Sequence, residues 1–380
     1  MAMPVPTIDA PPGLEGVVVA ETAIGDVRGD EGFYHYRGHP APRLAESRAF
    51  EDVWHLLHVG DLPTRAEGDG FRRHVGSMRR LPADLVPLLR AAAVAGGDLP
   101  ALVWLRSLVS LTAQHAGLTP WLGRDAEAVA DEALHLVAAM PTLVGLGWRT
   151  RNGLAELDPD PGRGVAADLL AMLHGTEPHP IAVRALERYL VLTIDHGFNA
   201  STLAARVLTS TGADLGSGMV AAMGALSGPL HGGAPVHALR MLEAIGSPER
   251  AWPWIEGSLD RGERLMGFGH RVYRTEDPRS VVLRSVAEEF TDPIVALAIE
   301  VEGVALAALQ RRHPQRPLRT NVEYYAGVVL HLCGIPSELF PAVFAVSRSV
   351  GWAAHMVEQA SANRLIRPAS RYVGTPRVGT

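Results

Sequence analysis

The stretch from Met266 to Ser280 holds side chains well suited to chemistry on an anion. It reads Met-Gly-Phe-Gly-His-Arg-Val-Tyr-Arg-Thr-Glu-Asp-Pro-Arg-Ser, so a histidine and several arginines follow two glycines. Glycine allows the backbone to approach a ligand closely, because it has no Cβ. The pattern is not a dinucleotide-binding fingerprint, since Val272 stands where the third glycine is required.

The second half of this stretch predicts the start of a helix. Asp277 is a favourable N-cap, Pro278 suits the first helical position, and apolar residues then recur at helical spacing. Arg279 would lie in the first turn, where the helix dipole disfavours a cation unless an anion binds there. We interpret Arg279 either as a solvated side chain or as a ligand for an anion.

Other stretches place polar residues where a helical core would need apolar ones. They lie at 195–202, 228–235, 321–327, 347–355 and 367–374, and they contain His196, His231, Glu323, Arg348 and Arg367. Taken singly, a histidine at a helix end is usually a cap, and an arginine beside aromatic residues usually packs against them. Together, a carboxylate base, histidines and arginines suit proton abstraction from carbon beside a bound polyanion.

The composition limits the possible functions. The chain has 380 residues, 47% of them apolar, and a formal net charge of −6, so it can bury a large core and has no basic surplus for binding nucleic acid. All 35 basic residues are arginine, which excludes Schiff-base and phosphate-loop lysines. Cys333 is the only cysteine, so no intrachain disulfide can form, and a cytoplasmic location is expected.

Apolar spacing predicts a mainly α protein. Helices are expected over 50–57, closed by Gly60, and over 84–95, 101–116, 126–139, 166–174 and 181–194; one or two short strands are expected between Gly13 and Gly38, and a polar loop over 149–164. The most apolar run, Ala133 to Trp148, is shorter than the roughly 18 residues of a membrane span, so no membrane anchor is expected. No metal site is expected either, because His55 and His58 lack a third ligand in register.

Four phrases, in this order, resemble the citrate synthase family. They are Asp-His-Gly-Phe-Asn-Ala-Ser-Thr, Gly-Pro-Leu-His-Gly-Gly-Ala, Met-Gly-Phe-Gly-His-Arg-Val-Tyr with Asp-Pro-Arg, and Ser-Arg-Ser-Val-Gly-Trp. The likeness covers 13–64 and most of 195–374. It implies a helical fold with a large and a small domain, here predicted as 1–231 and 329–380 for the large domain and 232–328 for the small one.

The resemblance also implies roles for individual residues. His231 corresponds to the donor at the thioester oxygen of acetyl-CoA, His270 to the group that polarises the ketone of oxaloacetate, and Glu323 to the base that deprotonates the methyl carbon. Binding of oxaloacetate falls to His196, Arg279, Arg348 and Arg367, the last of them supplied across a homodimer interface. The coenzyme's adenine would meet the backbone of Arg264, Leu265, Met266, Gly267 and Phe268. Acetyl-CoA is expected as a co-substrate, and no permanently bound cofactor is expected.

The sequence departs from the family pattern at three places. Glu323 stands where aspartate is usual, and its extra methylene moves the carboxylate by roughly an ångström, which can cost on the order of 100-fold in rate. Pro235 replaces an asparagine that many members carry, and Arg319 with Thr320 replaces a common Tyr-Pro. Arg319 is either a contact for coenzyme phosphate or a solvated side chain.

Three functions remain compatible with these residues. The first is a citrate synthase. The second is a 2-methylcitrate synthase that uses propionyl-CoA, since one methyl group changes binding by only about 1–3 kcal/mol and the residues around the oxaloacetate site do not report on it. The third is a citrate synthase-like protein that binds its ligands without catalysis, which the departures at Glu323 and Pro235 would suit.

Overall fold

The computed structural model describes residues 7–231, 234–270, 272–315 and 317–374. Arg271 and the two glycines at 232 and 233, which belong to the predicted motifs, lie outside these ranges. The described elements are mainly α-helices, which confirms the predicted fold class. Their bounds are η1 Pro12–Leu14, β1 Gly25–Arg28, β2 Phe33–Tyr36, β3 His39–Pro40, α1 Ala41–Ser47, α2 Phe50–Val59, α3 Arg65–Ser77, α4 Val86–Val94, α5 Ala101–His115, α6 Ala126–Arg151, α7 Val165–His174, α8 Pro180–Thr193, α9 Ala200–Ser210, α10 Leu215–Leu226, α11 Ala234–Ile245, α12 Pro248–Asp260, α13 Pro278–Ala287, α14 Pro293–Arg312, α15 Val322–Leu332, η2 Ser337–Leu339 and α16 Phe340–Ser361.

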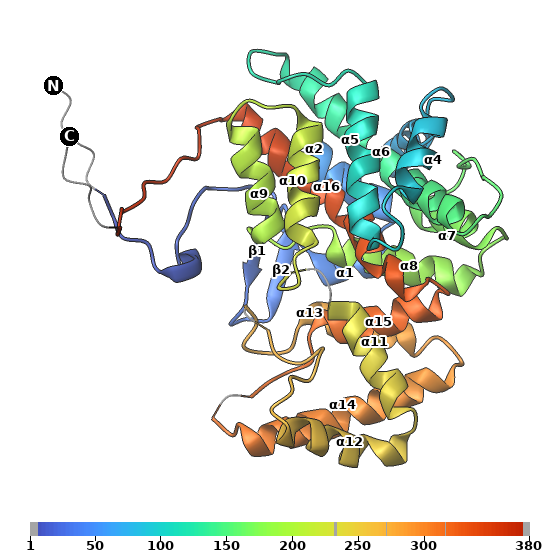
Figure 1. Cartoon of the computed structure of the whole chain (residues 1–380), viewed down its shortest axis with the longest axis vertical. Helices are drawn as coiled ribbons and strands as arrows, with labels where there is room; N and C mark the ends of the chain where they lie inside the picture. The colour runs from blue at the N-terminus through green and yellow to red at the C-terminus, as the bar shows by residue number, and fades with distance from the viewer. Residues whose placement is uncertain (1–6, 232–233, 271, 316, 375–380) are drawn as a thin grey trace.

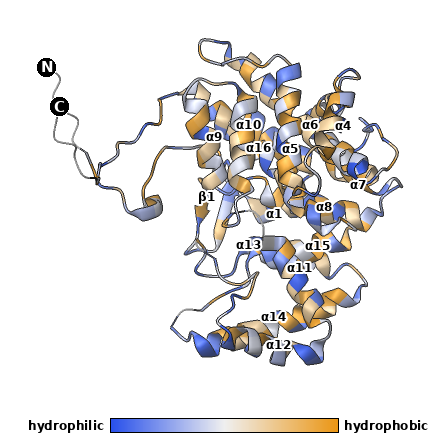
Figure 2. Cartoon of the chain, viewed as in Figure 1, coloured by the Kyte–Doolittle hydropathy of each residue, from blue (hydrophilic) through white to orange (hydrophobic). Residues whose placement is uncertain are grey.

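The helices form an upper and a lower group (Figure 1). In the upper group, α16 runs through the middle and packs against α5, α6, α8, α9 and α10. In the lower group α12 packs on α14, and α11 and α13 pack on α15, while α8 contacts both α13 and α15. Long apolar stretches run through the upper helices, as expected for a shared core (Figure 2). The division of the chain at 231 and 328 remains a prediction, and residue 328 falls inside α15.

A three-stranded antiparallel sheet in the order β1-β2-β3 lies beside the junction of the two groups (Figure 1). Strand β2 alternates between partly exposed and buried residues, so Tyr34 and Tyr36 share the inner face. The hydroxyl of Tyr34 donates to the carbonyl of Leu192 and that of Tyr36 to the carbonyl of Val191, which fixes the sheet to the end of α8. The expected strand signal is thus confirmed at 33–36, whereas the β-branched run at 17–19 precedes β1 and forms no strand.

Local sequence signals predicted several helix ends correctly. Gly60 closes α2 in the left-handed conformation with φ of 119°, and the side chain of Asp277 caps α13 at the backbone N–H of Arg279. Helix α6, however, continues to Arg151 through Pro141, because packing of this buried segment in the core outweighs the helical hydrogen bond that proline cannot make. The predicted end at 139 is therefore wrong, and the polar loop begins only at residue 152.

Of the described helices, α6 and α14 are long and apolar enough to cross a membrane, with 78% and 44% of their apolar windows buried inside the protein. Buried core helices share this length and composition, so these two are weak grounds for a membrane span. The apolar run at 133–148 is part of a longer helix than its sequence suggested.

Candidate active site

The glycine-rich loop that carries His270 runs beside the segment that leads into α15. The backbone N–H of Gly269 donates to the carbonyl of Arg319 at 2.7 Å, and that of Asn321 donates to the carbonyl of Gly267 at 2.9 Å. Gly267 has φ of 89°, and a Cβ there would lie 2.8 Å from the side chain of Tyr324. Glycine is therefore required at 267 both by conformation and by space. This pairing brings the His270 loop next to Glu323.

Asp277 is a buried carboxylate that binds groups from two helices, α13 and α15. Besides capping α13, its carboxylate accepts from the guanidinium of Arg279, at 2.9 Å from Nε and 2.8 Å from Nη2, and from the backbone N–H of Val322 at 2.9 Å. It therefore joins α13 to α15. A cation in the first turn of α13 needs an anion nearby, and Asp277 supplies it. Arg279 is therefore a buried, paired side chain and not a solvated one.

His270 is a neutral imidazole whose proton lies on Nε2. Its Nδ1 accepts from the backbone N–H groups of Val272 and Tyr273, at 2.9 and 3.0 Å, so Nδ1 carries no hydrogen. Burial and the charge of Arg279 lower the pKa of His270 to about 4. Nε2 lies 3.1 Å from Nη2 of Arg279, which can only donate, so two N–H groups face each other there. An oxygen atom beside this pair, at hydrogen-bond distance from each nitrogen, could accept from both.

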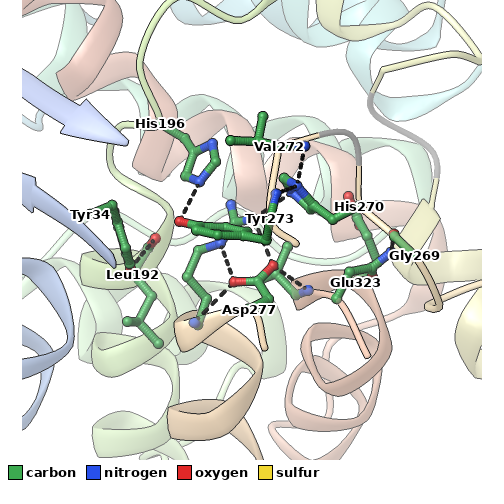
Figure 3. A network of polar contacts seen from close by, with 12 residues as sticks. Tyr34, Leu192, His196, Gly269, His270, Val272, Tyr273, Asp277 and Glu323 are labelled. Atoms are coloured by element: carbon green, nitrogen blue, oxygen red, sulfur yellow. Dashed lines mark hydrogen bonds and ion pairs between the residues drawn. The ribbon is translucent and has the colours of Figure 1, made fainter. Parts of the chain in front are cut away.

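The rings of His196, Tyr273 and His270 lie next to one another (Figure 3). The Tyr273 hydroxyl is 3.0 Å from Nε2 of His196, and the two imidazole rings have centroids 5.9 Å apart. Burial, together with Arg279 and Arg348, lowers the pKa of His196 well below its ordinary value. As a neutral group, His196 can hydrogen-bond a ligand without adding charge repulsion toward Arg279 and Arg348.

Arg348 enters from α16 with only 2% of its surface exposed. Its Nε donates to the carbonyl of Thr193 at 2.8 Å, and its guanidinium lies over the ring of Phe344. Burial lowers the pKa of Arg348, and Asp195 and Tyr36 oppose this only in part. The charge of Arg348 is thus less completely balanced than that of Arg279.

His231 contacts a hydroxyl that controls its tautomer. Its Nε2 lies 2.9 Å from Oγ of Ser201, which accepts from the indole N–H of Trp352 at 3.1 Å and donates to Oδ1 of Asn199 at 2.7 Å. With the serine proton on Asn199, the imidazole must donate through Nε2. A donor at Nδ1 requires that proton to turn toward His231. Burial, then the charge of Arg348, lowers the pKa of His231 to about 4, so the imidazole is neutral in either arrangement.

Glu323 is the second residue of α15, and its backbone N–H donates to the capping side chain of Asn321. Burial raises the pKa of Glu323 to about 7, although the charge of Arg279 opposes the rise. A carboxyl group with this pKa can gain and lose a proton near neutral pH, which is what a general base requires.

A cavity of about 230 Å³ opens between the His270 loop and the segment before α15. His270, Tyr273 and Asp277 line it on one side, and Arg274 and Arg319 add cationic side chains. The residues predicted to contact adenine, 264–268, directly precede the cavity-lining residues in the sequence. Among them, Leu265 and Phe268 are buried and Arg264 is exposed. Pro235 is buried, and its carbonyl lies where a Cβ on Gly327 would clash, so it packs against α15.

Arg367 is not brought to these groups by its own chain. It lies in the exposed segment after α16, which leaves the helical body as an extended arm (Figure 1). Sequence reasoning missed Tyr273, Ser201, Trp352 and Tyr34, although the first three stand inside the phrases already singled out. Polar or aromatic residues next to a predicted catalytic histidine were the available signal.

Comparisons with known proteins find relatives over nearly the whole chain. The family model described as "Citrate synthase, C-terminal domain" matches residues 13–369. A citrate synthase of Haloferax volcanii is 37% identical, covering 95% of each chain, and a 2-methylcitrate synthase of Mycobacterium tuberculosis is 36% identical, covering 98% of this chain and 94% of its own.

Solved structures match over nearly the whole chain as well. The citrate synthase of Pyrobaculum aerophilum has a TM-score of 0.86 at 34% identity, with 100% of this chain and 98% of that chain covered. The Thermoplasma acidophilum citrate synthase, in a ternary complex with carboxymethyl coenzyme A and oxaloacetate, has a TM-score of 0.87 at 28% identity, with 97% of each chain covered.

Proposed function

Since the chain belongs to the citrate synthase family, we propose that it condenses acetyl-CoA with oxaloacetate and hydrolyses the citryl thioester to citrate and CoA. One observation carries the proposal to this site. The Nε2 of a neutral His270 and Nη2 of Arg279 both carry hydrogen and lie 3.1 Å apart, so a keto or alkoxide oxygen beside the pair could accept from both. Such preorganised donors stabilise the charge that develops in the transition state.

The remaining groups suit the other proton movements. Glu323, with a pKa of about 7, takes a proton from the methyl carbon of acetyl-CoA. With the Ser201 proton turned toward its Nε2, a neutral His231 donates through Nδ1 to the thioester oxygen as enolate charge develops. The methyl carbon then attacks the ketone, and the new alkoxide receives its proton on the His270 side. Water cleaves the thioester in the second step and releases CoA.

The acyl-CoA is bound as a co-substrate at the His270 loop. Arg274 and Arg319 line the cavity beside this loop and suit the phosphates of a coenzyme. The adenine would lie against the backbone of 264–268. Arg319 thus has a ligand-binding role in preference to a solvated one.

The active unit is a homodimer in which Arg367 reaches the partner's oxaloacetate site. Residues 362–374 form no helix or strand, and apolar side chains on this arm are exposed, including Leu365 at 54% and Val373 at 90%. The side-chain amide of Asn363 and the backbone N–H of Ile366 bind Ser210 at the end of α9, and beyond them the chain leaves its own helical body (Figure 1). An exposed extended segment of this kind suits a docking role on a second subunit. We place the enzyme in the cytoplasm, where its single buried thiol, Cys333, would stay reduced.

The second candidate is 2-methylcitrate synthesis from propionyl-CoA, favoured by the relative of that name at 36% identity. Initial rates with the two acyl-CoA thioesters distinguish them. We expect a higher kcat/KM with acetyl-CoA, and a higher value with propionyl-CoA would assign the second activity.

The test of catalysis itself is the release of free thiol from acetyl-CoA, with and without oxaloacetate. We expect release to depend on oxaloacetate. Release at the background rate, from protein that calorimetry shows to bind oxaloacetate, would instead identify a ligand-binding protein without catalysis.

A further inference from the structure

The hairpin formed by β1 and β2 contacts the segment that carries His196. The ring of Tyr34 lies 5.6 Å from the His196 ring, centroid to centroid, and its hydroxyl donates to the carbonyl of Leu192 at 3.2 Å (Figure 3). From β1, a side-chain methyl of Val27 lies 3.5 Å from the place of a Cβ on Gly197. The hairpin therefore supports His196 from both of its strands.

The turn of the same hairpin contacts the loop that carries His270. The backbone N–H of Arg274 donates to the carbonyl of Gly29 at 3.1 Å. A Cβ on Gly29 would lie 2.1 Å from the carbonyl oxygen of Val272, well inside any permitted contact. Gly29 does not have a positive φ, so its glycine is required by this close approach and not by the backbone conformation.

We propose that the β1–β2 hairpin sets the spacing between His196 and His270, and that Gly29 is its positioning residue. The inference rests on the proposed function, in which both imidazoles serve one substrate. The two histidines come from separate segments, one after α8 and one before α13, and the hairpin touches both. A displacement of about 1 Å in such a site can cost on the order of 100-fold in rate.

The variant Gly29→Ala tests this directly. Its methyl group would push the carbonyl of Val272 away by about 1 Å, and His270 with it, because Nδ1 of His270 accepts from the N–H of Val272. We expect kcat/KM for oxaloacetate to fall on the order of 100-fold, with both a higher KM and a lower kcat.

Gly70→Ala is the matched control. Gly70 lies in α3, a Cβ added to it would have no neighbouring atom within 4 Å, and it does not have a positive φ. We expect wild-type kinetics from it. If Gly29→Ala is folded by circular dichroism and has the kinetics of Gly70→Ala, the inference is wrong.

A second measurement needs no variant and decides the matter should Gly29→Ala fail to fold. Hydrogen exchange of the wild-type protein is followed with and without saturating oxaloacetate. We expect exchange to slow both in 25–36 and in 272–279. Slowing in 272–279 alone would overturn the role of the hairpin. The proposed function fails separately, namely when the wild-type protein releases no thiol in the presence of oxaloacetate.

Discussion

The two halves of the site hold their arginines in opposite ways. Around Asp277, the charge of Arg279 is matched by a buried carboxylate that also binds the N-terminus of α15, and although burial opposes it, Asp277 raises the pKa of Arg279. On α16, Arg348 has a carbonyl as its hydrogen-bonded partner, and burial lowers its pKa. The first arginine is therefore part of the fold as well as the site, whereas the second has more to gain from an anionic ligand.

The largest expected loss of activity follows the removal of the proposed base, Glu323. Glu323→Gln keeps the size of the side chain but cannot accept the proton, so we expect kcat to fall by about 10²–10⁴-fold while the protein stays folded. Stopped-flow assays of thiol release measure this. Activity within tenfold of wild type would transfer the role of base to another group. Glu323→Asp, which shortens the reach, shows whether the backbone has compensated for the extra methylene.

Removal of His270 should come next in size. His270→Ala deletes the N–H donor that we propose for the ketone oxygen, and we expect a fall of about 10²–10³-fold in kcat with a folded dimer. Steady-state kinetics together with sedimentation of the variant check both parts. Near-normal turnover would remove His270 from the assigned role.

The comparison between the arginines is sharpened by replacing each with glutamine. Arg279→Gln leaves Asp277 buried without its cation and should cost about 3–5 kcal/mol of unfolding free energy. Arg348→Gln should mainly weaken oxaloacetate binding, by about 2–5 kcal/mol. Denaturant unfolding and calorimetric titration of both variants separate the two effects. Equal losses of stability would show that the two charges are held alike.

The smallest expected effect is the dependence of kcat/KM on pH, which reports the ionisation of Glu323. Since the pKa of Glu323 is raised to about 7, its carboxylate becomes available only as the pH rises through this value. Both His270 and His231, with pKa values of about 4, stay neutral over the same range. We therefore expect kcat/KM to fall about tenfold per pH unit below 7, as for a single ionisation. A profile that is flat down to pH 5 would contradict this.

Short-range signals in the sequence predicted much of this architecture. Asp277 and Pro278 predicted the start of α13, and Gly60 predicted the end of α2. The family phrases located His196, His270 and Arg279, which lie around Tyr273. Helix α3 was overlooked because Phe71 and Val75 are its only large apolar residues, yet Thr64 and Glu67 form a capping box that the sequence displays.

Other features depend on contacts between distant segments. The sequence around Asp277 does not show that its carboxylate binds both the Arg279 side chain and the backbone N–H of Val322. It also does not show that the turn at Gly29 lies against Val272. The continuation of α6 past Pro141 likewise depends on the core around it. Such contacts are set by packing, which local propensity does not report.

The double attachment of Asp277 has a mechanical consequence. Because one carboxylate fastens the first turns of α13 and α15 together, and the His270 loop is paired with the strand-like lead into α15, three reacting groups share a single frame. When the protein opens to admit its substrates, we expect this frame to move as one rigid body. The distances among Glu323, His270 and Arg279 would then stay the same in each catalytic cycle.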